Sequence, residues 1–360
     1  MTTATTIRSL TFHAARSTLS RPIADATHAI PAIEFIVCDL ALANGVVGQS
    51  YLLAFHYSRE AIRGALRDLA AFAQGRDAVA TQAFLADWNR ETEYFGHEGV
   101  QRWAAGLANV AMWDAHARTL GVPVWQLLGG SARAVPVYGS GGWLSYTDEE
   151  LLDEVRGYVR RGFAAVKIKV GSPEPGRDLA RLAKVRDAVG AHVRVMMDAN
   201  QGMSVPAALD LALAARELGI GWFEEPVEHR DFAGYAFLRQ RAGIALAMGE
   251  REYDTLALRE LVARNALDLW QPDLLRLGSV EAWRDSAAFA AAHGLPVLPH
   301  YYRDYDVPLL CTIGNGQGAE SFDWIDGIVD EPMRVENGHA YPRNTPGWGF
   351  RFRESALEAL

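Results

Sequence analysis

The sequence predicts an α/β protein in which a TIM-type (β/α)8 barrel follows an α+β capping region. From about residue 135 onward, short strand-like runs alternate with helical patterns, and such alternation implies parallel βαβ units. Eight strand-like runs are present, which is the number of strands in a (β/α)8 barrel. An open, doubly wound sheet is the rival architecture. It would more often carry a Gly-rich phosphate loop after its first strand, and the sequence has none there.

The first 130 residues lack this rhythm and are predicted to form the capping domain. Two strands, 36–40 and 46–54, are joined by the turn residues Asn44-Gly45. Three helical patterns follow, near 59–74, 78–89 and 99–120. The last pattern stops at Gly121-Val122-Pro123, as a helix should. We expect the Pro- and Gly-rich segment 331–360 to pack back on this domain and complete it.

The catalytic barrel is predicted to span residues 131–330. Its expected strands are 135–140, 164–170, 193–199, 221–225, 245–250, 267–273, 295–300 and 318–321. The helical stretches between them include 148–161, 178–189, 205–218, 254–264 and 279–293. Many of the strands end in a polar or ionisable residue, and in a parallel barrel the active site lies at these C-terminal strand ends.

Composition and net charge limit the classes of partner that the protein is expected to bind. The chain has 360 residues, of which 49% are hydrophobic and 22% charged, so it is globular. Its two cysteines, Cys38 and Cys311, make a disulfide framework unexpected. A net charge of −9 argues against nucleic acid or an anionic membrane as the main partner. Because residues 1–10 show no signal-peptide pattern and no run approaches the roughly 20 apolar residues of a membrane span, a cytoplasmic enzyme is expected.

Three acidic residues end three consecutive predicted strands. Asp198, Glu224 and Glu250 are spaced 26 and 26 residues apart, one βα repeat each, so they should converge at a similar height. Any one of them alone could be a helix cap or part of a surface ion pair. Three carboxylates in one pocket require a cation, and hard oxygen ligands with an incomplete shell suit Mg²⁺. The pattern therefore predicts a magnesium site.

Two lysines lie on the same face of the second predicted barrel strand. Lys167 and Lys169 are two residues apart, and the apolar residues around them indicate a deeply packed strand. If both face the barrel interior, each ammonium disfavours the charge of the other. We expect this repulsion, with a nearby cation, to lower a lysine pKa toward the range of a general base. A solvent-facing strand end is the alternative.

A second candidate acid/base combines Asp273 and His300, which end the neighbouring sixth and seventh strands. Neighbouring strands lie about 4.8 Å apart, within carboxylate–imidazole reach. Such a carboxylate fixes the histidine tautomer and raises its basicity. Because the sixth strand lies across the barrel from the second, Lys169 and His300 are expected to address opposite faces of one substrate.

Three further polar residues are candidates at the barrel mouth. Glu320 ends the eighth strand and could donate a hydrogen bond if protonated, or accept one from a substrate hydroxyl. Ser140 and Asn200 could bind substrate or could equally be turn and capping residues.

These motifs resemble those of the enolase superfamily and, within it, the mandelate racemase subgroup. In chain order the matching motifs are KIK at 167–169, DAN at 198–200, WFEEP at 222–226, GE at 249–250, QPD at 271–273, then His300 and Glu320. NGVVGQSYL at 44–52 and MWDAHARTLGVPVWQLLGG at 112–130 are similar to the family's capping domain. The resemblance covers essentially the whole chain and implies a (β/α)7β-like barrel.

The resemblance also implies residue roles, because enolase-superfamily enzymes pair a Lys or His base with Mg²⁺. Lys169 would be the base on one face of the substrate, and His300, oriented by Asp273, the acid/base on the other. Lys167 would touch the substrate carboxylate near the metal, and Glu320 would hydrogen-bond to it in the enediolate. The implied Mg²⁺ ligands are Asp198, Glu224 and Glu250, with the first acid of the pair 224–225 on the metal.

Two reactions remain open after the enediolate forms. Return of a proton to the opposite face gives racemisation or epimerisation, whereas protonation of a β-hydroxyl gives dehydration. The segment 301–306 favours an acid-sugar dehydratase, because Tyr301 and Arg303 suit hydroxyls or a second carboxylate. The polar stretch 90–94 of the capping region points the same way. The apolar residues of the loop near 20–33 keep a racemase open, and the 301–306 segment could instead be purely structural.

Two other classes are weighed against these enzymes. A non-catalytic binding protein on the same fold would have lost a metal ligand or Lys169, and neither is lost. A metal hydrolase would more often use histidine ligands, whereas the three positions here are all carboxylates. The expected partner is a small carboxylate substrate, and the resemblance implies a homo-oligomer.

Overall fold

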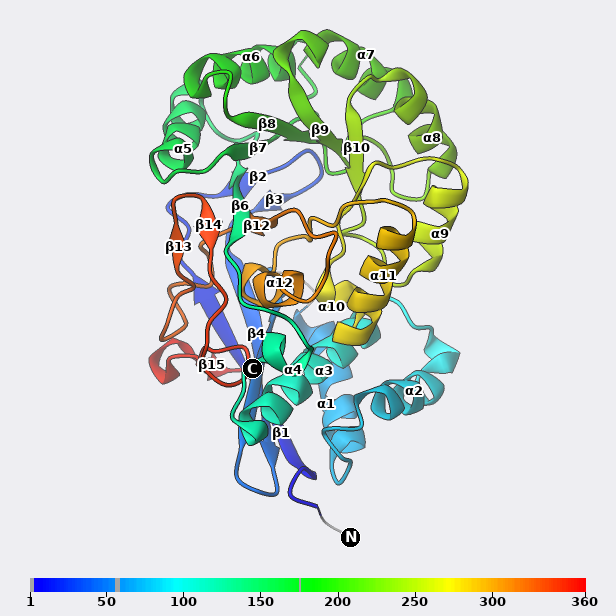
Figure 1. Cartoon of the computed structure of the whole chain (residues 1–360), viewed down its shortest axis with the longest axis vertical. Coiled ribbons are helices and arrows are strands. Elements are labelled where there is room, and N and C mark those ends of the chain that lie inside the picture. The colour runs from blue at the N-terminus through cyan, green and yellow to red at the C-terminus, as the bar shows by residue number, and fades with distance from the viewer. Residues whose placement is uncertain (1–2, 56–58, 175) are drawn as a thin grey trace.

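The barrel sheet is built from strands that follow one another around a circle. The computed structural model describes residues 3–55, 59–174 and 176–360 (Figure 1). The parallel strands, each hydrogen-bonded to the next, are β6 (Val135–Gly141), β7 (Ala165–Lys169), β8 (Arg194–Asp198), β9 (Ile220–Glu224), β10 (Ala245–Met248) and β11 (Leu269–Trp270). The last strand, β12 (Ala319–Ser321), pairs in parallel with β6 and closes the circle. The predicted barrel class is therefore confirmed.

The seventh strand is reduced to a single bridging residue. Val297 pairs in parallel with Trp270 on one side and with Gly316 on the other. Pro296 and Pro299 flank it, and neither can donate a ladder hydrogen bond, so the predicted strand 295–300 does not extend. His300 still follows at the barrel mouth, because its N–H donates to the Pro272 carbonyl oxygen (3.0 Å).

An outer ring of helices covers the barrel (Figure 1). Its members are α5 (Asp148–Arg160), α6 (Arg177–Val189), α7 (Val205–Ala215, continued by a 3-10 turn, Arg216–Leu218), α8 (Phe232–Arg241), α9 (Leu256–Ala263) and α11 (Val280–Ala292). Local chemistry fixes their starts. Thr147 and Glu150 form a reciprocal capping box at α5, and the Ser204 side chain caps α7. Two further helices follow candidate site residues: α10 (Leu274–Leu277) begins directly after Asp273, and α12 (Arg303–Leu310) begins three residues after His300.

The N-terminal region is an antiparallel sheet covered by helices. Its strands are β1 (Ile7–Ser17), β4 (Ile33–Leu42) and β5 (Val47–Leu53), with β15 (Glu358–Ala359) paired to the outer edge of β1. Its helices are α1 (Arg59–Ala73), α2 (Thr81–Glu91) and α3 (Val100–Leu120), followed by α4 (Val124–Leu127) and, between α2 and α3, a 3-10 turn (Glu93–Phe95). Near the C-terminus, β13 (Val335–Glu336), β14 (His339–Ala340) and a 3-10 turn (Glu354–Ala356) complete the chain, and β14 pairs with β6. No described helix is long and apolar enough to cross a membrane.

A hairpin from the N-terminal region lies over the barrel mouth. β2 (Ile23–Ala24) pairs with β3 (Ala29–Ile30), and the Leu144 N–H donates to the Ala24 carbonyl oxygen at 2.8 Å. Glycine permits this contact: a Cβ on Gly202 would lie 2.4 Å from the Cβ of Ala26. The close approach brings residues of the capping region to the C-terminal ends of the barrel strands.

Candidate active site

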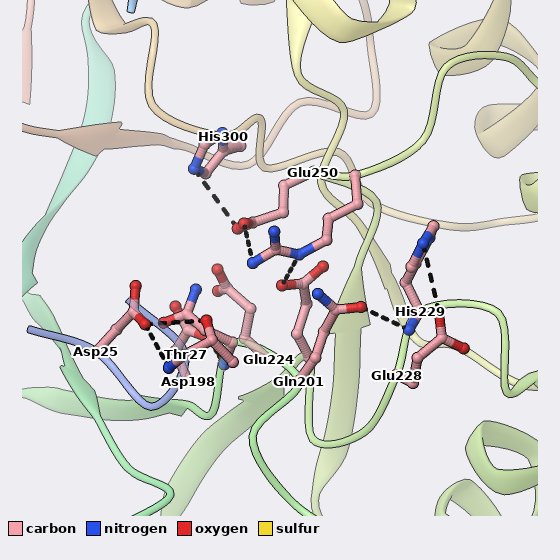
Figure 2. A network of polar contacts seen from close by, with 12 residues as sticks. Asp25, Thr27, Asp198, Gln201, Glu224, Glu228, His229, Glu250 and His300 are labelled. Carbon is pink, nitrogen blue, oxygen red and sulfur yellow. Dashed lines mark hydrogen bonds and ion pairs between the residues drawn. The ribbon is translucent and has the colours of Figure 1, made fainter. Parts of the chain in front are cut away.

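Three buried carboxylates meet at the C-terminal ends of consecutive strands. Asp198 ends β8, Glu224 ends β9, and Glu250 follows β10 by two residues. Asp198 and Glu224 are direct partners in the parallel ladder, which sets them at equal height. One ligand oxygen from each of the three lies within 4.8 Å of the others. Figure 2 shows the three side chains gathered into one space below His300.

The chemistry of this cluster fits a hard divalent cation. Burial would raise the pKa of Glu224, and the neighbouring acids add to that effect; Lys167 only partly offsets it, leaving the pKa at about 7. Three carboxylates that repel one another in a buried site are stabilised by a cation, and all-oxygen donors suit Mg²⁺. Asn200 adds a buried Oδ1 that has no hydrogen-bond partner among the described residues. The donor set therefore fits the predicted Mg²⁺.

Both predicted lysines reach this cluster, but their electrostatics differ from the expectation. Lys169 Nζ lies 2.5 Å from an Asp198 oxygen, and Lys167 Nζ contacts Glu224 and lies 2.8 Å from Glu320. Burial alone would lower both lysine pKa values, but the facing carboxylates outweigh it and raise them. The expected fall of a lysine pKa depended on a nearby cation and stays a prediction; among the protein's own groups, the facing carboxylates outweigh the repulsion between the two ammoniums.

His300 and Asp273 form the predicted dyad. His300 Nδ1 lies 2.8 Å from Asp273 Oδ2, and the Nε2 atom lies 3.5 Å from Glu250. Burial would lower the pKa of His300, but the Glu250 charge and the hydrogen bond to Asp273 raise it to about 9. Asp273 is itself fixed, because its other oxygen accepts from the N–H groups of Leu275 and Arg276 at the start of α10.

Glu320 is held as a carboxylate rather than as a hydrogen-bond donor. It accepts from the Tyr301 N–H at 3.0 Å and pairs with Lys167. Burial would raise the pKa of Glu320, but Lys167 and His300 lower it to about 2. Of the two roles expected for Glu320, donor and acceptor, the ion pair with Lys167 favours the acceptor.

An outer layer of polar contacts, which sequence reasoning missed, supports the acids. Arg251 pairs with Glu225 at 3.0 Å and with Glu250 at 3.4 Å. The sequence signal that could have identified Arg251 is its position immediately after Glu250. Asn200, Glu225 and Tyr301 have φ of 41°, 37° and 67°, in the left-handed region, which asparagine tolerates but which strains the backbone at Glu225 and Tyr301. These residues follow β8, β9 and His300, where the chain must turn its side chains into the mouth.

The pocket above the acids is walled by aromatic rings as well as polar groups. Trp143, Phe322 and Trp324 line it, and the Phe322 and Trp324 rings stack at 4.3 Å between centroids. The capping region contributes Asp25, His28 and Ile30 from the β2–β3 hairpin and residues 52–55 that end β5. The wall therefore combines surfaces for apolar and hydroxylated parts of a ligand.

The four residues predicted to bind substrate lie in different environments. Asn200 and Tyr301 line the pocket. Ser140 is buried on β6 opposite Lys167 in the ladder, and its Oγ has no partner among the described residues. Arg303 is only 1% exposed and lies within 2.9 Å of Asp323 and 2.5 Å of Asp326. Its proposed substrate contact is corrected, because a helix turns it away from the mouth into an ion-pair cluster.

The predicted second capping stretch, 90–94, does not line the pocket either. Tyr94 is 86% exposed to solvent, and Glu93 borders a separate surface hollow with Arg102 and Tyr253. The capping helix that does reach the pocket is α3, through Trp103.

Comparison with known proteins agrees with this geometry. An enolase C-terminal domain-like family model matches residues 150–356, and a mandelate racemase / muconate lactonizing enzyme N-terminal domain model matches residues 7–129. Arabinonate dehydratase of Saccharolobus solfataricus is 28% identical over 343 residues, covering 91% of this chain and 90% of its own.

Two solved structures share the fold over nearly their whole length. An enolase from alpha proteobacterium BAL199 with bound magnesium has a TM-score of 0.92 and 30% identity, covering 98% of this chain and 99% of its own. An enolase from Bradyrhizobium complexed with magnesium and mandelic acid has a TM-score of 0.91 and 27% identity, covering 99% and 98%. The chain belongs to the enolase superfamily, and within it to the group that resembles mandelate racemase and muconate lactonizing enzyme.

Proposed function

We propose that this protein is a Mg²⁺-dependent enzyme that removes the proton α to a carboxylate, and that it dehydrates an acid sugar to a 2-keto-3-deoxy acid. The observation that carries the proposal is the placement of two acid/base groups around the three-carboxylate cluster. Lys169 pairs with Asp198 at one side of the cluster, and His300 faces Glu250 at the other. A substrate held over the cluster would therefore meet one group on each side.

The mechanism follows from where charge develops. Mg²⁺ held by Asp198, Glu224 and Glu250 would supply Lewis-acid stabilisation of the substrate carboxylate as the α-proton leaves. Lys169 abstracts that proton in its neutral form. Lys167, held by Glu224 and Glu320, presents an ammonium to the same developing negative charge. Buried side chains keep water from competing for these contacts.

His300 then decides the product. Glu250 and the hydrogen bond to Asp273 raise the pKa of His300, which favours the protonated imidazole that can donate a proton. Donation to a β-hydroxyl expels water and leaves the enol of the product, which tautomerises to the 2-keto-3-deoxy acid. The Saccharolobus relative named as an arabinonate dehydratase supports this outcome.

A racemase is the second candidate function. The aromatic wall of Trp143, Phe322 and Trp324 favours it, because this surface could hold an aryl group. The Bradyrhizobium neighbour with mandelic acid points the same way. In this case His300 would return its proton to the α-carbon rather than to a leaving group.

Proton NMR in D₂O with Mg²⁺ tests both candidates against a panel of sugar acids and mandelate. A 2-keto-3-deoxy product would establish dehydration. Solvent deuterium at the α-carbon of both configurations, without loss of water, would establish the racemase. Mg²⁺ binding with neither product, across the panel, would favour a non-catalytic protein on this fold.

We also propose that the enzyme acts as a homo-oligomer. Tyr94 and Phe95 are 86% and 81% exposed and stack edge to face at 5.4 Å, which is an apolar surface that a second copy would cover. Light scattering of the purified protein at several concentrations would measure its mass.

A further inference from the structure

One cationic side chain in the pocket wall has no acidic partner among the described residues. Arg276, in α10, lines the pocket and forms no hydrogen bond or ion pair through its guanidinium with any described residue. The other cationic groups of the wall each face a carboxylate: Lys169 faces Asp198, Arg251 faces Glu225, His300 faces Asp273, and His28 lies near Asp25. Their charge is already balanced within the protein, whereas that of Arg276 is not.

The Arg276 guanidinium is held in place by an indole from the capping helix. It lies 5.7 Å from the ring centroid of Trp103, which also lines the pocket. The Trp103 Nε1 atom is buried and has no acceptor among the described residues. A buried donor without a partner costs free energy, and a bound acceptor would remove that cost. Within the described part of the chain, the wall thus holds a cation without an acidic partner next to an indole whose buried N–H has no acceptor.

The approach of two helices creates this pairing. A Cβ on Gly106 of α3 would lie 3.0 Å from the Leu275 carbonyl oxygen of α10, and a Cβ on Gly278 would lie 2.1 Å from Arg102. Only glycine allows α3 and α10 to pack this closely. Trp103 from the capping region and Arg276 from the barrel are consequently neighbours across the seam between the two parts of the fold.

The position of Arg276 relative to the reacting groups is set by Asp273. The Arg276 N–H donates to Asp273 Oδ1 at 3.0 Å, and Asp273 Oδ2 lies 2.8 Å from His300 Nδ1. Arg276 is therefore joined to the His300 side of the site, away from Lys167 and the strand β7. A substrate whose first carboxylate lies at the metal, with its β-carbon toward His300, would extend its far end in this direction.

We infer that Arg276 and Trp103 bind the second carboxylate of a sugar diacid, so that the substrate class is aldaric rather than aldonic acids. This inference rests on the proposed acid-sugar dehydration. A guanidinium matches a carboxylate in bidentate geometry, and the indole N–H adds a third donor. In a protein of net charge −9, an unpaired arginine also offsets the repulsion that a second substrate carboxylate would meet.

The test compares six-carbon aldaric acids with aldonic acids of the same hydroxyl configuration. The wild-type enzyme is expected to favour the diacid by at least about tenfold in kcat/KM. Arg276→Gln should lower kcat/KM for the diacid by about ten- to a hundredfold, the range for a lost hydrogen bond to a charged group, and leave the monoacid within about threefold. Arg276→Lys should restore part of the loss, and Trp103→Phe, which keeps the ring and removes the N–H, should cost less than Arg276→Gln.

Arg284→Gln is the matched control, because Arg284 lies on α11 and lines a different hollow. Arg284→Gln should leave kcat/KM unchanged for both the diacid and the monoacid. Equal turnover of monoacids and diacids by the wild type, or an equal loss of both in Arg276→Gln, would overturn the inference and leave the proposed dehydration intact. Absence of any keto-deoxy product would instead count against the proposed function.

Calorimetry gives a readout that does not depend on turnover. With Mg²⁺ present, adipate should bind the wild type more tightly than hexanoate, and Arg276→Gln should remove this preference. No preference in the wild type, or the same preference in the variant, would contradict the subsite.

Discussion

At the scale of single residues, the site is a set of buried charges that determine one another. Lys167 is shared between Glu224 and Glu320, so the lysine stays charged and Glu320 stays ionised. Among the described residues, Lys169 has one carboxylate within ion-pair distance, Asp198, and Glu250 and Glu224 act on its charge from farther away. Binding of a cation at Asp198 would compete with that pairing, which makes Lys169 the lysine that can lose its proton most readily.

Separate variants of the two acid/base groups should have separable effects. Lys169→Ala is expected to abolish exchange of the α-hydrogen in one configuration, and His300→Asn the exchange in the other, each by about a hundredfold or more. Proton NMR in D₂O with each substrate configuration measures this. Lys184→Ala on the exposed face of α6 and His293→Asn at the end of α11 are the controls. If both active-site variants keep full exchange, the two-base mechanism is wrong.

Replacing Asp273, the carboxylate that contacts His300, should shift the pH range over which His300 titrates. Asp273→Asn removes the charge that helps to hold the pKa of His300 at about 9 and still caps α10. Since His300 must be protonated to donate, activity falls as pH rises through its pKa, and this fall should move to lower pH in the variant. We expect kcat to drop about ten- to a hundredfold, with less change in KM. A pH–rate profile that coincides with the wild type would argue against the orienting role.

At the scale of elements, the acids at strand ends were easier to place than the charged residues of helices α10 and α12. A strand alternates its side chains and ends at one edge of the barrel, so Asp198, Glu224 and Glu250 could be placed together from spacing alone. Helix α12 starts at Arg303, and successive residues of a helix point in different directions around its axis. Composition therefore could not predict that Arg303 forms buried ion pairs. Arg276 was missed for a related reason: α10 has only four residues and carries no periodic pattern.

Two strand expectations show where sequence patterns fail. β1 (Ile7–Ser17) was not predicted, because its burial does not alternate regularly and polar residues interrupt it. Its place is fixed by ten residues of pairing with β4, a tertiary constraint. Strand 295–300 was overpredicted because its apolar residues outweighed two prolines, whose missing N–H groups limit pairing to Val297.

Helix α12 also contains a destabilising acid. Asp306 is fully buried, and neither carboxylate oxygen has a hydrogen-bond partner among the described residues. Burial, with Asp273, Glu320 and Asp304 nearby, raises the pKa of Asp306 well above its usual value. The folded state therefore binds a proton that the unfolded chain has released, and stability falls as pH rises above about 4.

Asp306→Asn should remove this pH dependence. We expect the variant to be more stable than the wild type at pH 8, because it has no carboxyl that must bind a proton on folding, and to differ little at pH 4. Thermal unfolding at both pH values measures the difference. Asp210→Asn, on the exposed face of α7, should show no such trend. A stability difference that does not grow with pH would mean that Asp306 finds a partner or is never ionised.

At the scale of the whole molecule, the pocket exists only where two parts of the fold meet. The barrel supplies the acids, lysines and histidine at its strand ends, whereas the N-terminal region supplies the β2–β3 hairpin, the end of β5 and Trp103. The reacting groups therefore come from the barrel, whereas the N-terminal region supplies groups that surround the rest of the substrate. This division lets substrate preference change in the capping region while the reacting groups stay fixed.

The metal should stabilise the whole molecule, because its three ligands come from β8, β9 and β10 and repel one another without a cation. Binding to the folded state alone raises the free energy of unfolding, by about 2.7 kcal/mol at a Mg²⁺ concentration 100 times the dissociation constant. Thermal unfolding with increasing Mg²⁺, at constant ionic strength, should show this rise. Asp198→Asn should weaken the response, whereas Asp210→Asn should keep it. An unchanged response in Asp198→Asn would place the cation elsewhere in the molecule.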